Sequence, residues 1–185
     1  MTNRVCSVMT IVKSTRRVYA MLLAASFTIA LLIRLTAMSA TQCLLGFTFP
    51  GLRPSLTTAT SVFLNNARLA LVLFAFALVM SLGGTRGRSD PDVLARVACA
   101  LMDAIVAAVV LLNVALVGAS VGAYGARMVR TLLPHGPLEV LAYSIAISAY
   151  ANARMGRRQH WRDLVLAGGA CLVMLAVAAM VETYL

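Results

Sequence analysis

Long apolar stretches separated by short polar segments are the main feature of this chain. Five of them cover residues 18–38, 61–82, 97–118, 137–153 and 164–184, and a helix needs roughly 20 apolar residues to cross the hydrocarbon core of a bilayer. Within a bilayer, only helices and closed barrels bond all of their backbone groups. The pattern therefore predicts an all-α fold, a polytopic membrane helix bundle with about five transmembrane helices, in a single integral membrane domain over residues 1–185.

The segment 119–136, between the third and fourth stretches, is too apolar for a solvated loop. We expect it to form a short interfacial helix or a re-entrant turn packed inside the protein. Glycines at positions 118, 122 and 125 also allow a second helix to approach closely. We favour this packing role for the glycines over a role in ligand binding.

Composition supports the membrane assignment and limits the kinds of binding partner to be expected. Hydrophobic residues make up 61% of the chain, charged residues 12%, and the mean hydropathy is +0.90, which is too apolar for a soluble domain of this length. The net charge is +10, but the basic residues lie in short segments between apolar stretches. Anionic lipid headgroups are the simplest partner for them, so we expect contact with the lipid bilayer and none with nucleic acid.

The basic residues also predict the orientation, because cytoplasmic segments carry an excess of Lys and Arg. They gather in three regions separated by an even number of stretches: the N-terminus (Arg4, Lys13, Arg16, Arg17), the segment after the second stretch (Arg86, Arg88, Arg96) and the segment after the fourth (Arg154, Arg157, Arg158, Arg162). The other side holds fewer: Arg53, Arg127 and Arg130. We therefore expect the N-terminus in the cytoplasm and the C-terminus outside.

Under this orientation, several polar residues fall at one depth near the outer face. Contact with lipid is unfavourable for each of them, so we expect them to line a pocket between the second, third and fourth stretches. The residues are Asn65, Asn66, Arg68, Asn113, His135 and Glu139. We assign binding roles to Asn65, Arg68 and Asn113, and add Arg130 from the preceding segment.

Glu139 has two interpretations. Pro137 suits the first position of a helix, and a carboxylate in the first turn is stabilised by free backbone N–H groups and the helix dipole. Alternatively, Glu139 and His135 form an acid–base pair that activates water, with Asn66 or Asn113 donating a hydrogen bond to a developing oxyanion. The second interpretation makes Glu139, His135 and Asn66 catalytic candidates, although no known protease motif supports it.

Metal and cofactor sites have little support. The four cysteines are scattered singly and the two histidines lie in different segments, so no zinc-binding spacing is present. His135 and Glu139 alone are too few ligands for a zinc site. We expect no metal and no cofactor.

These residues resemble the stage II sporulation protein M family of bacterial membrane proteins. The similarity is carried by Phe63-Leu64-Asn65-Asn66-Ala67-Arg68, by Asn113 with Gly118, and by Leu133-Pro134-His135-Gly136-Pro137-Leu138-Glu139. The resemblance implies a multi-pass protein of the bacterial cytoplasmic membrane, in which Asn66, His135 and Glu139 are the shared polar residues. Sporulation members of the family recruit peptidoglycan-remodelling partners during engulfment, and other members accompany small ribosomal peptides such as circular bacteriocins.

The chain is short for the family and offers nothing beyond its helices to dock a soluble partner, which favours a peptide-directed role. Our first hypothesis is a non-catalytic membrane component that binds a precursor peptide or membrane protein partners, for peptide maturation, export or envelope remodelling. The alternative is a membrane-embedded peptidase that removes a leader from a ribosomal peptide precursor. A transporter is weaker, because one polar layer provides no continuous ionisable path.

Overall fold

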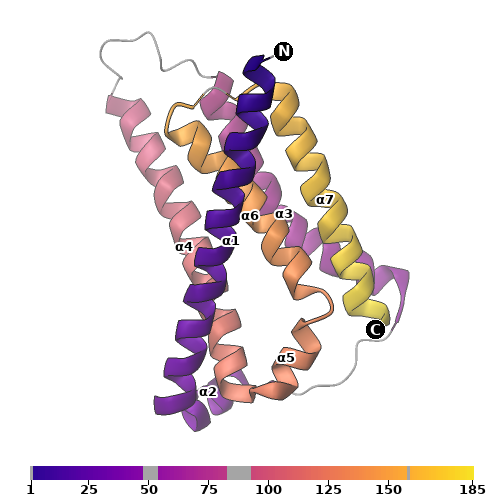
Figure 1. Ribbon diagram of the computed structural model, residues 1–185. Coiled ribbons are helices and arrows are strands. Elements are labelled where there is room, and N and C mark those ends of the chain that lie inside the picture. Colours follow the sequence, from indigo (N-terminus) through magenta and orange to yellow (C-terminus); the bar gives the residue numbers. More distant parts are fainter. Residues whose placement is uncertain (1, 48–53, 83–92, 158) are drawn as a thin grey trace.

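The computed structural model describes residues 2–47, 54–82, 93–157 and 159–185, and over these residues it is an all-α bundle (Figure 1). The described residues contain no strand. The helices are α1 (Thr2–Thr36), α2 (Met38–Leu45), α3 (Leu56–Leu82), α4 (Val93–Tyr124), α5 (Ala126–Leu132), α6 (Gly136–Arg154) and α7 (Trp161–Tyr184). The all-α prediction is confirmed.

Five helices run along the length of the bundle, in alternating directions, and the two short ones, α2 and α5, lie at one end (Figure 1). The N-terminus is at the opposite end from α2 and α5. Segments of α1, α3, α4 and α7 are long and apolar enough to cross a membrane: Val12–Thr36, Leu56–Ser81, Arg96–Tyr124 and Trp161–Tyr184. The fifth predicted span, 137–153, forms helix α6, which is 19 residues long and not among these four.

Helix α6 is less apolar because it lies inside the bundle. It packs against α1, α3 and α7, and its buried residues are Ala142, Ser144, Ala146, Ser148, Ala149, Tyr150, Asn152 and Ala153. Small side chains allow neighbouring helices to approach closely. A helix covered by protein does not need the continuous hydrocarbon surface that lipid requires, so serine and asparagine are accommodated there.

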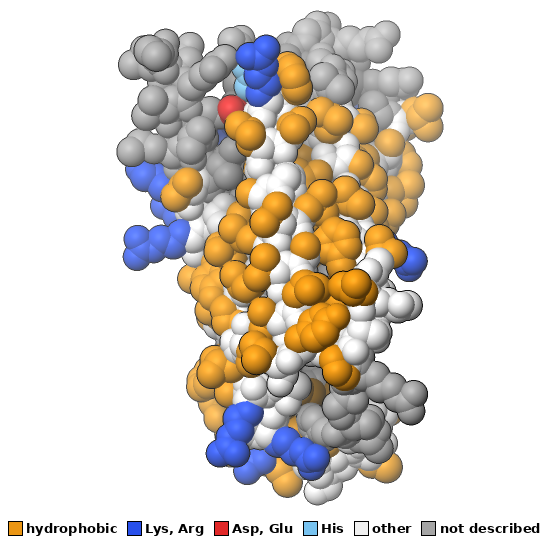
Figure 2. All heavy atoms as spheres, turned by 90° about the vertical axis from the view of Figure 1, so that its right-hand side faces the viewer, with side chains coloured by type: hydrophobic (Ala, Val, Ile, Leu, Met, Phe, Trp, Pro, Cys, Tyr) orange, Lys and Arg blue, Asp and Glu red, His pale blue; other side chains and the backbone are white. Residues whose placement is uncertain are grey.

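The outer surface of the bundle has the opposite character. Large hydrophobic side chains such as Phe27 on α1, Leu111 on α4 and Leu166 on α7 are exposed. Figure 2 shows hydrophobic side chains over most of the middle of one face, with basic side chains at its upper and lower ends and at its left and right edges. An apolar belt between charged ends is the surface expected of a protein surrounded by lipid.

The predicted glycine packing is found between α1 and α4. A Cβ atom at Gly118 would lie 2.7 Å from the backbone oxygen of Ser26, and one at Gly122 would lie 2.5 Å from that of Ala30. Gly125 has a φ of 58° and separates α4 from α5. The segment 119–136 is therefore not a loop: its first part extends α4, and most of the rest forms the short helix α5.

Helix boundaries differ from the predicted spans mainly at the starts. Helix α3 begins at Leu56 rather than near 61, because the Ser55 hydroxyl accepts a hydrogen bond from the Thr58 backbone N–H (3.1 Å) and thereby caps the helix. Helix α2 occupies part of the predicted outer segment and ends at Leu45, followed by Gly46 in the left-handed conformation. The charges at Arg53, Arg86, Arg88 and Arg158 lie outside the described residues.

Candidate functional site

A histidine and two glutamates meet between the start of α6 and the end of α7. His135 directly precedes α6, Glu139 lies in the first turn of α6, and Glu182 lies in the last turn of α7. One ligand atom from each of these side chains lies within 4.8 Å of the others. Two elements that are distant in the sequence thus bring three ionisable groups together.

Asn66 of α3 joins this group through Glu139. Its side-chain amide donates a hydrogen bond of 2.6 Å to Glu139 Oε1, and the Tyr143 hydroxyl donates to the backbone oxygen of Asn66 (3.2 Å). Tyr143 lies one turn after Glu139 on α6. We call Asn66, His135, Glu139 and Glu182 the polar cluster; the structure brings together the three predicted catalytic candidates within it.

The local sequence explains how His135 and Glu139 are presented. Pro137 occupies the first turn of α6 and has the φ that a helix start requires, and the Glu139 N–H donates to the His135 backbone oxygen (3.2 Å). Residues four apart lie on the same side of a helix. The helix start therefore fixes the imidazole and the carboxylate on one side, facing α7 and α3.

His135 is buried, with 5% of its surface exposed, and lies between α5 and α6, outside the spanning helices. Burial lowers the pKa of the His135 imidazole, and the opposing effect of the Glu182 carboxylate, which raises it, is smaller. The imidazole is therefore neutral at neutral pH. A neutral imidazole has a free lone pair with which to accept a proton or bind a cation.

The helix-start interpretation of Glu139 explains Pro137 but not the direction of the carboxylate. Glu139 lies in the first turn of α6, as that interpretation requires. Its side chain nevertheless accepts a hydrogen bond across the bundle, from Asn66 of α3. Because a bond to another helix is not needed to start α6, Glu139 also has a role in the polar cluster.

The four predicted binding residues lie outside the polar cluster. Asn65, Arg68 and Arg130 are exposed, and Asn65 and Arg68 are on the surface of α3 that does not carry Asn66. Asn113 is also exposed, and its side chain donates to the Val109 backbone oxygen of its own helix (2.8 Å). We expected the second, third and fourth stretches to line one pocket. Asn113 does not join the other polar residues, because α4, which carries it, packs mainly against α1.

Glu182 and Tyr143 belong to the site, and sequence analysis missed both. Glu182 lies near the end of the last apolar stretch. A lone carboxylate in such a stretch, at the depth predicted for Glu139, was the signal that could have revealed it. Tyr143 has the same spacing from Glu139 as Glu139 has from His135, four residues, and so the same side of α6.

Asn66 lies deeper in its helix than the sequence suggested. Helix α3 starts at Leu56, ten residues before Asn66, which corresponds to about 15 Å along the helix axis. The polar cluster therefore lies well inside α3, although it lies at the start of α6 and at the end of α7.

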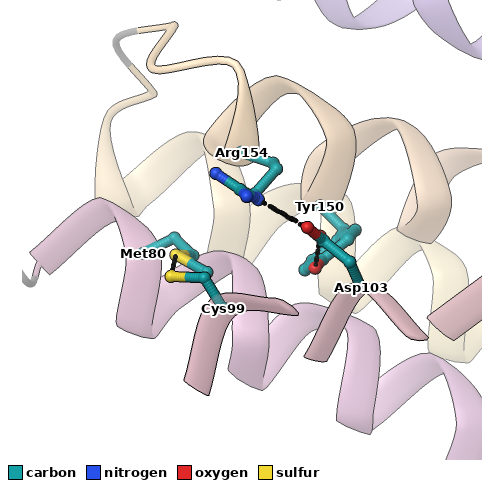
Figure 3. Close-up of polar contacts among 5 residues, drawn as sticks. All are labelled: Met80, Cys99, Asp103, Tyr150 and Arg154. Atoms are coloured by element: carbon teal, nitrogen blue, oxygen red, sulfur yellow. Dashed lines mark hydrogen bonds and ion pairs between the residues drawn. The ribbon is translucent and has the colours of Figure 1, made fainter. Parts of the chain in front are cut away.

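A second polar group lies at the other end of α6 (Figure 3). The Tyr150 hydroxyl donates to Asp103 Oδ1 (2.5 Å), and Arg154 Nε donates to Asp103 Oδ2 (2.9 Å). Beside it, Cys99 Sγ lies 4.0 Å from Met80 Sδ. This partly exposed group links α4 to α6.

The polar cluster contains more ligand atoms than the two that sequence analysis considered. Imidazole nitrogen and carboxylate oxygen both bind divalent cations, and Glu182 supplies a third side chain to His135 and Glu139. The expectation of no metal site rested on two ligands, and the structure provides three. The same groups can also transfer protons to and from water.

Comparison with known families connects this geometry to other proteins. A family model described as Stage II sporulation protein M matches residues 18–185 of the chain, which include all four members of the polar cluster. A search of curated proteins gave no significant match. A search of solved structures gave none either.

Proposed function

The chain belongs to the stage II sporulation protein M family, and from this premise we propose that it acts on a small peptide, or on a segment of a protein partner, at the polar cluster. The proposal places the protein in the bacterial cytoplasmic membrane, with the N-terminus in the cytoplasm. The cluster then lies toward the outer side, where a precursor or an envelope protein is within reach.

The observation that carries this proposal is the meeting of His135, Glu139 and Glu182 with Asn66 inside an apolar bundle. Burial of ionisable groups at membrane depth is costly, and such groups usually mark functional sites. Packing and helix capping account for neither the buried imidazole nor the two neighbouring carboxylates.

The reaction that this arrangement favours is hydrolysis of a peptide bond. In the described part of the chain, no serine, threonine or cysteine side chain is hydrogen-bonded to His135 or Glu139, so water is the nucleophile. Glu139 removes the proton from this water and then gives it to the leaving amine, while the neutral His135 imidazole accepts a hydrogen bond from the water and so positions it. Asn66 orients the Glu139 carboxylate through their 2.6 Å hydrogen bond.

A second candidate is binding of a partner without catalysis, as in a scaffold. It is favoured by the existing bond between Asn66 and Glu139, which ties up the carboxylate oxygen that a general base would use. In this case the polar cluster recognises an amide or ammonium group of the partner, and its proton chemistry is not used.

Glu139→Gln separates the two candidates, because glutamine keeps the shape of glutamate and accepts the Asn66 hydrogen bond but is not a base. We expect cells that express the wild-type protein with a candidate precursor peptide to accumulate a shortened product. With Glu139→Gln, this product falls by at least about 100-fold, which is the low end of general acid–base catalysis. Mass spectrometry of the peptides in cells and medium measures the difference.

Asp103→Asn is the matched control, because it neutralises a carboxylate at the other end of the bundle whose ion pair with Arg154 is partly exposed. It should leave the product unchanged. Equal processing by wild-type protein and Glu139→Gln rejects the peptidase. Capture of the uncleaved peptide by a photo-crosslinker at Leu138, but not at Leu166 on the opposite end of α7, then supports the binding candidate.

A further inference from the structure

We propose that His135, Glu139 and Glu182 together bind one divalent metal cation, Zn²⁺ or Mn²⁺. This inference rests on the proposed function and changes one step of it: with His135 and Glu139 as ligands, the bound cation would lower the pKa of a coordinated water and so supply the nucleophile in place of proton removal by Glu139. The binding itself is derived from the geometry alone.

The ligand set has the chemistry of such a site. It offers one imidazole nitrogen, which suits Zn²⁺, and carboxylate oxygens, which suit both Zn²⁺ and Mn²⁺. Atoms bound to one zinc ion at about 2.0–2.2 Å lie roughly 3–4 Å from one another. The 4.8 Å limit on the three ligand atoms is therefore within a small side-chain adjustment of a coordinated arrangement.

His135 gives independent support. Only 5% of its surface is exposed, and a ring nitrogen points toward the two carboxylates. In the described part of the chain, the imidazole makes no hydrogen bond, either within its own helix start or to a neighbour. The imidazole thus faces two carboxylates without bonding to either, which is the arrangement expected if a cation lies between them.

The charges lead to the same conclusion. Glu139 and Glu182 are close together and half-buried, so two negative charges there repel each other more strongly than they would in water. Neither glutamate forms an ion pair with Lys or Arg within the described residues. A divalent cation between them removes the repulsion and accounts for both carboxylates being there.

Asn66 holds one ligand in place. Residues that hydrogen-bond to a metal ligand fix its orientation, and removing them typically weakens metal binding by about 10–100-fold. The 2.6 Å bond from the Asn66 amide to Glu139 Oε1 leaves the second carboxylate oxygen available. Three protein ligands on a four-coordinate ion also leave one position for water.

Metal binding can be tested on the purified full-length protein in detergent. After removal of metals with chelator, titration with ZnCl₂ or MnCl₂ should show one ion bound per chain by calorimetry and by elemental analysis. Glu182→Gln and His135→Ala should each weaken binding by about 100-fold or more, and Asn66→Ala by about 10–100-fold. His160→Ala, which removes the other histidine at the start of α7, should bind as the wild type does.

X-ray absorption of the zinc-loaded wild-type protein tests the same inference without relying on any variant to fold. It should show nitrogen and oxygen neighbours, including one imidazole, and no sulfur. Sulfur ligation, failure of the wild type to bind either ion, or unchanged binding by both Glu182→Gln and His135→Ala would overturn the proposal. Metal bound without peptide cleavage rejects hydrolysis but not the site, whereas cleavage in metal-free protein rejects a role of the metal in hydrolysis.

Discussion

At the scale of single residues, two adjacent asparagines illustrate how position on a helix decides a role. Asn65 and Asn66 have the same side chain, but a helix turns by about 100° per residue. Asn66 therefore faces α6 and bonds to Glu139, while Asn65 is exposed. Asn65 can therefore serve as the control when the contribution of Asn66 to the polar cluster is measured.

Asn66→Ala should lower the free energy of unfolding by about 1–3 kcal/mol, because it removes a hydrogen bond to a carboxylate and leaves that carboxylate partly buried without its partner. Chemical denaturation in detergent, followed by circular dichroism, measures the change. Asn65→Ala should stay within about 0.5 kcal/mol of wild type, as exposed substitutions usually do. Equal effects of the two substitutions would contradict the assignment of Asn66 to the polar cluster.

At the scale of helices, the close contact between α1 and α4 depends on two glycines one helical turn apart. Van der Waals packing takes the place of the hydrophobic effect in holding helices together inside a bilayer. At Gly118 and Gly122 the neighbours of a new Cβ include backbone atoms of Ser26 and Ala30, which cannot rotate away. This contact holds α4 against α1, and so keeps Asn113 away from the polar cluster.

Gly122→Val should therefore separate α1 from α4 and lower the free energy of unfolding by about 1–3 kcal/mol or more, the usual cost of overpacking. Chemical denaturation of the purified protein in detergent measures the loss. Gly169→Ala on α7 is the control, because no atom lies within 4 Å of a Cβ there. It should be neutral or stabilise the helix by about 0.5–1 kcal/mol; a loss as large as that of Gly122→Val would show that the α1–α4 contact is not special.

At the scale of the whole molecule, polar groups are divided between two regions of the bundle. Asp103, Tyr150 and Arg154 lie toward the end that carries the N-terminus, and the polar cluster lies toward the other. Between them α6 buries Ser144 and Ser148, which are not ionisable. The arrangement favours a site near one membrane face over a path for ions across the membrane.

A native cysteine can test whether the polar cluster lies toward the outer face or the cytoplasmic face of the membrane. Cys43 is exposed on α2, at the end of the bundle opposite the N-terminus, whereas Cys171 is buried. If the N-terminus is cytoplasmic, a membrane-impermeant maleimide added to intact cells should label Cys43, and Cys43→Ser should lose this labelling. Labelling that requires cell lysis, or that persists in Cys43→Ser, would reverse the orientation and place the polar cluster toward the cytoplasm.

The sequence by itself determined the fold class, the positions of the apolar helices and the close packing at Gly118 and Gly122. Each of these depends on a property that is local in the chain: the length of an apolar stretch or the absence of a side chain. The sequence also singled out His135, Glu139 and Asn66, because ionisable and amide groups are conspicuous against a hydrocarbon background.

Only the tertiary structure decided which of these polar residues meet. Whether Asn66 or Asn65 faces the interior depends on the rotation of α3, and whether α4 reaches the cluster depends on which helix it packs against. Glu182 joins His135 and Glu139 only because α7 runs beside α6 and ends at the level where α6 begins. Helix pairing inside a bilayer is set by the fit of small side chains between helices rather than by hydrophobicity. The order of apolar and polar residues along the chain does not specify that fit.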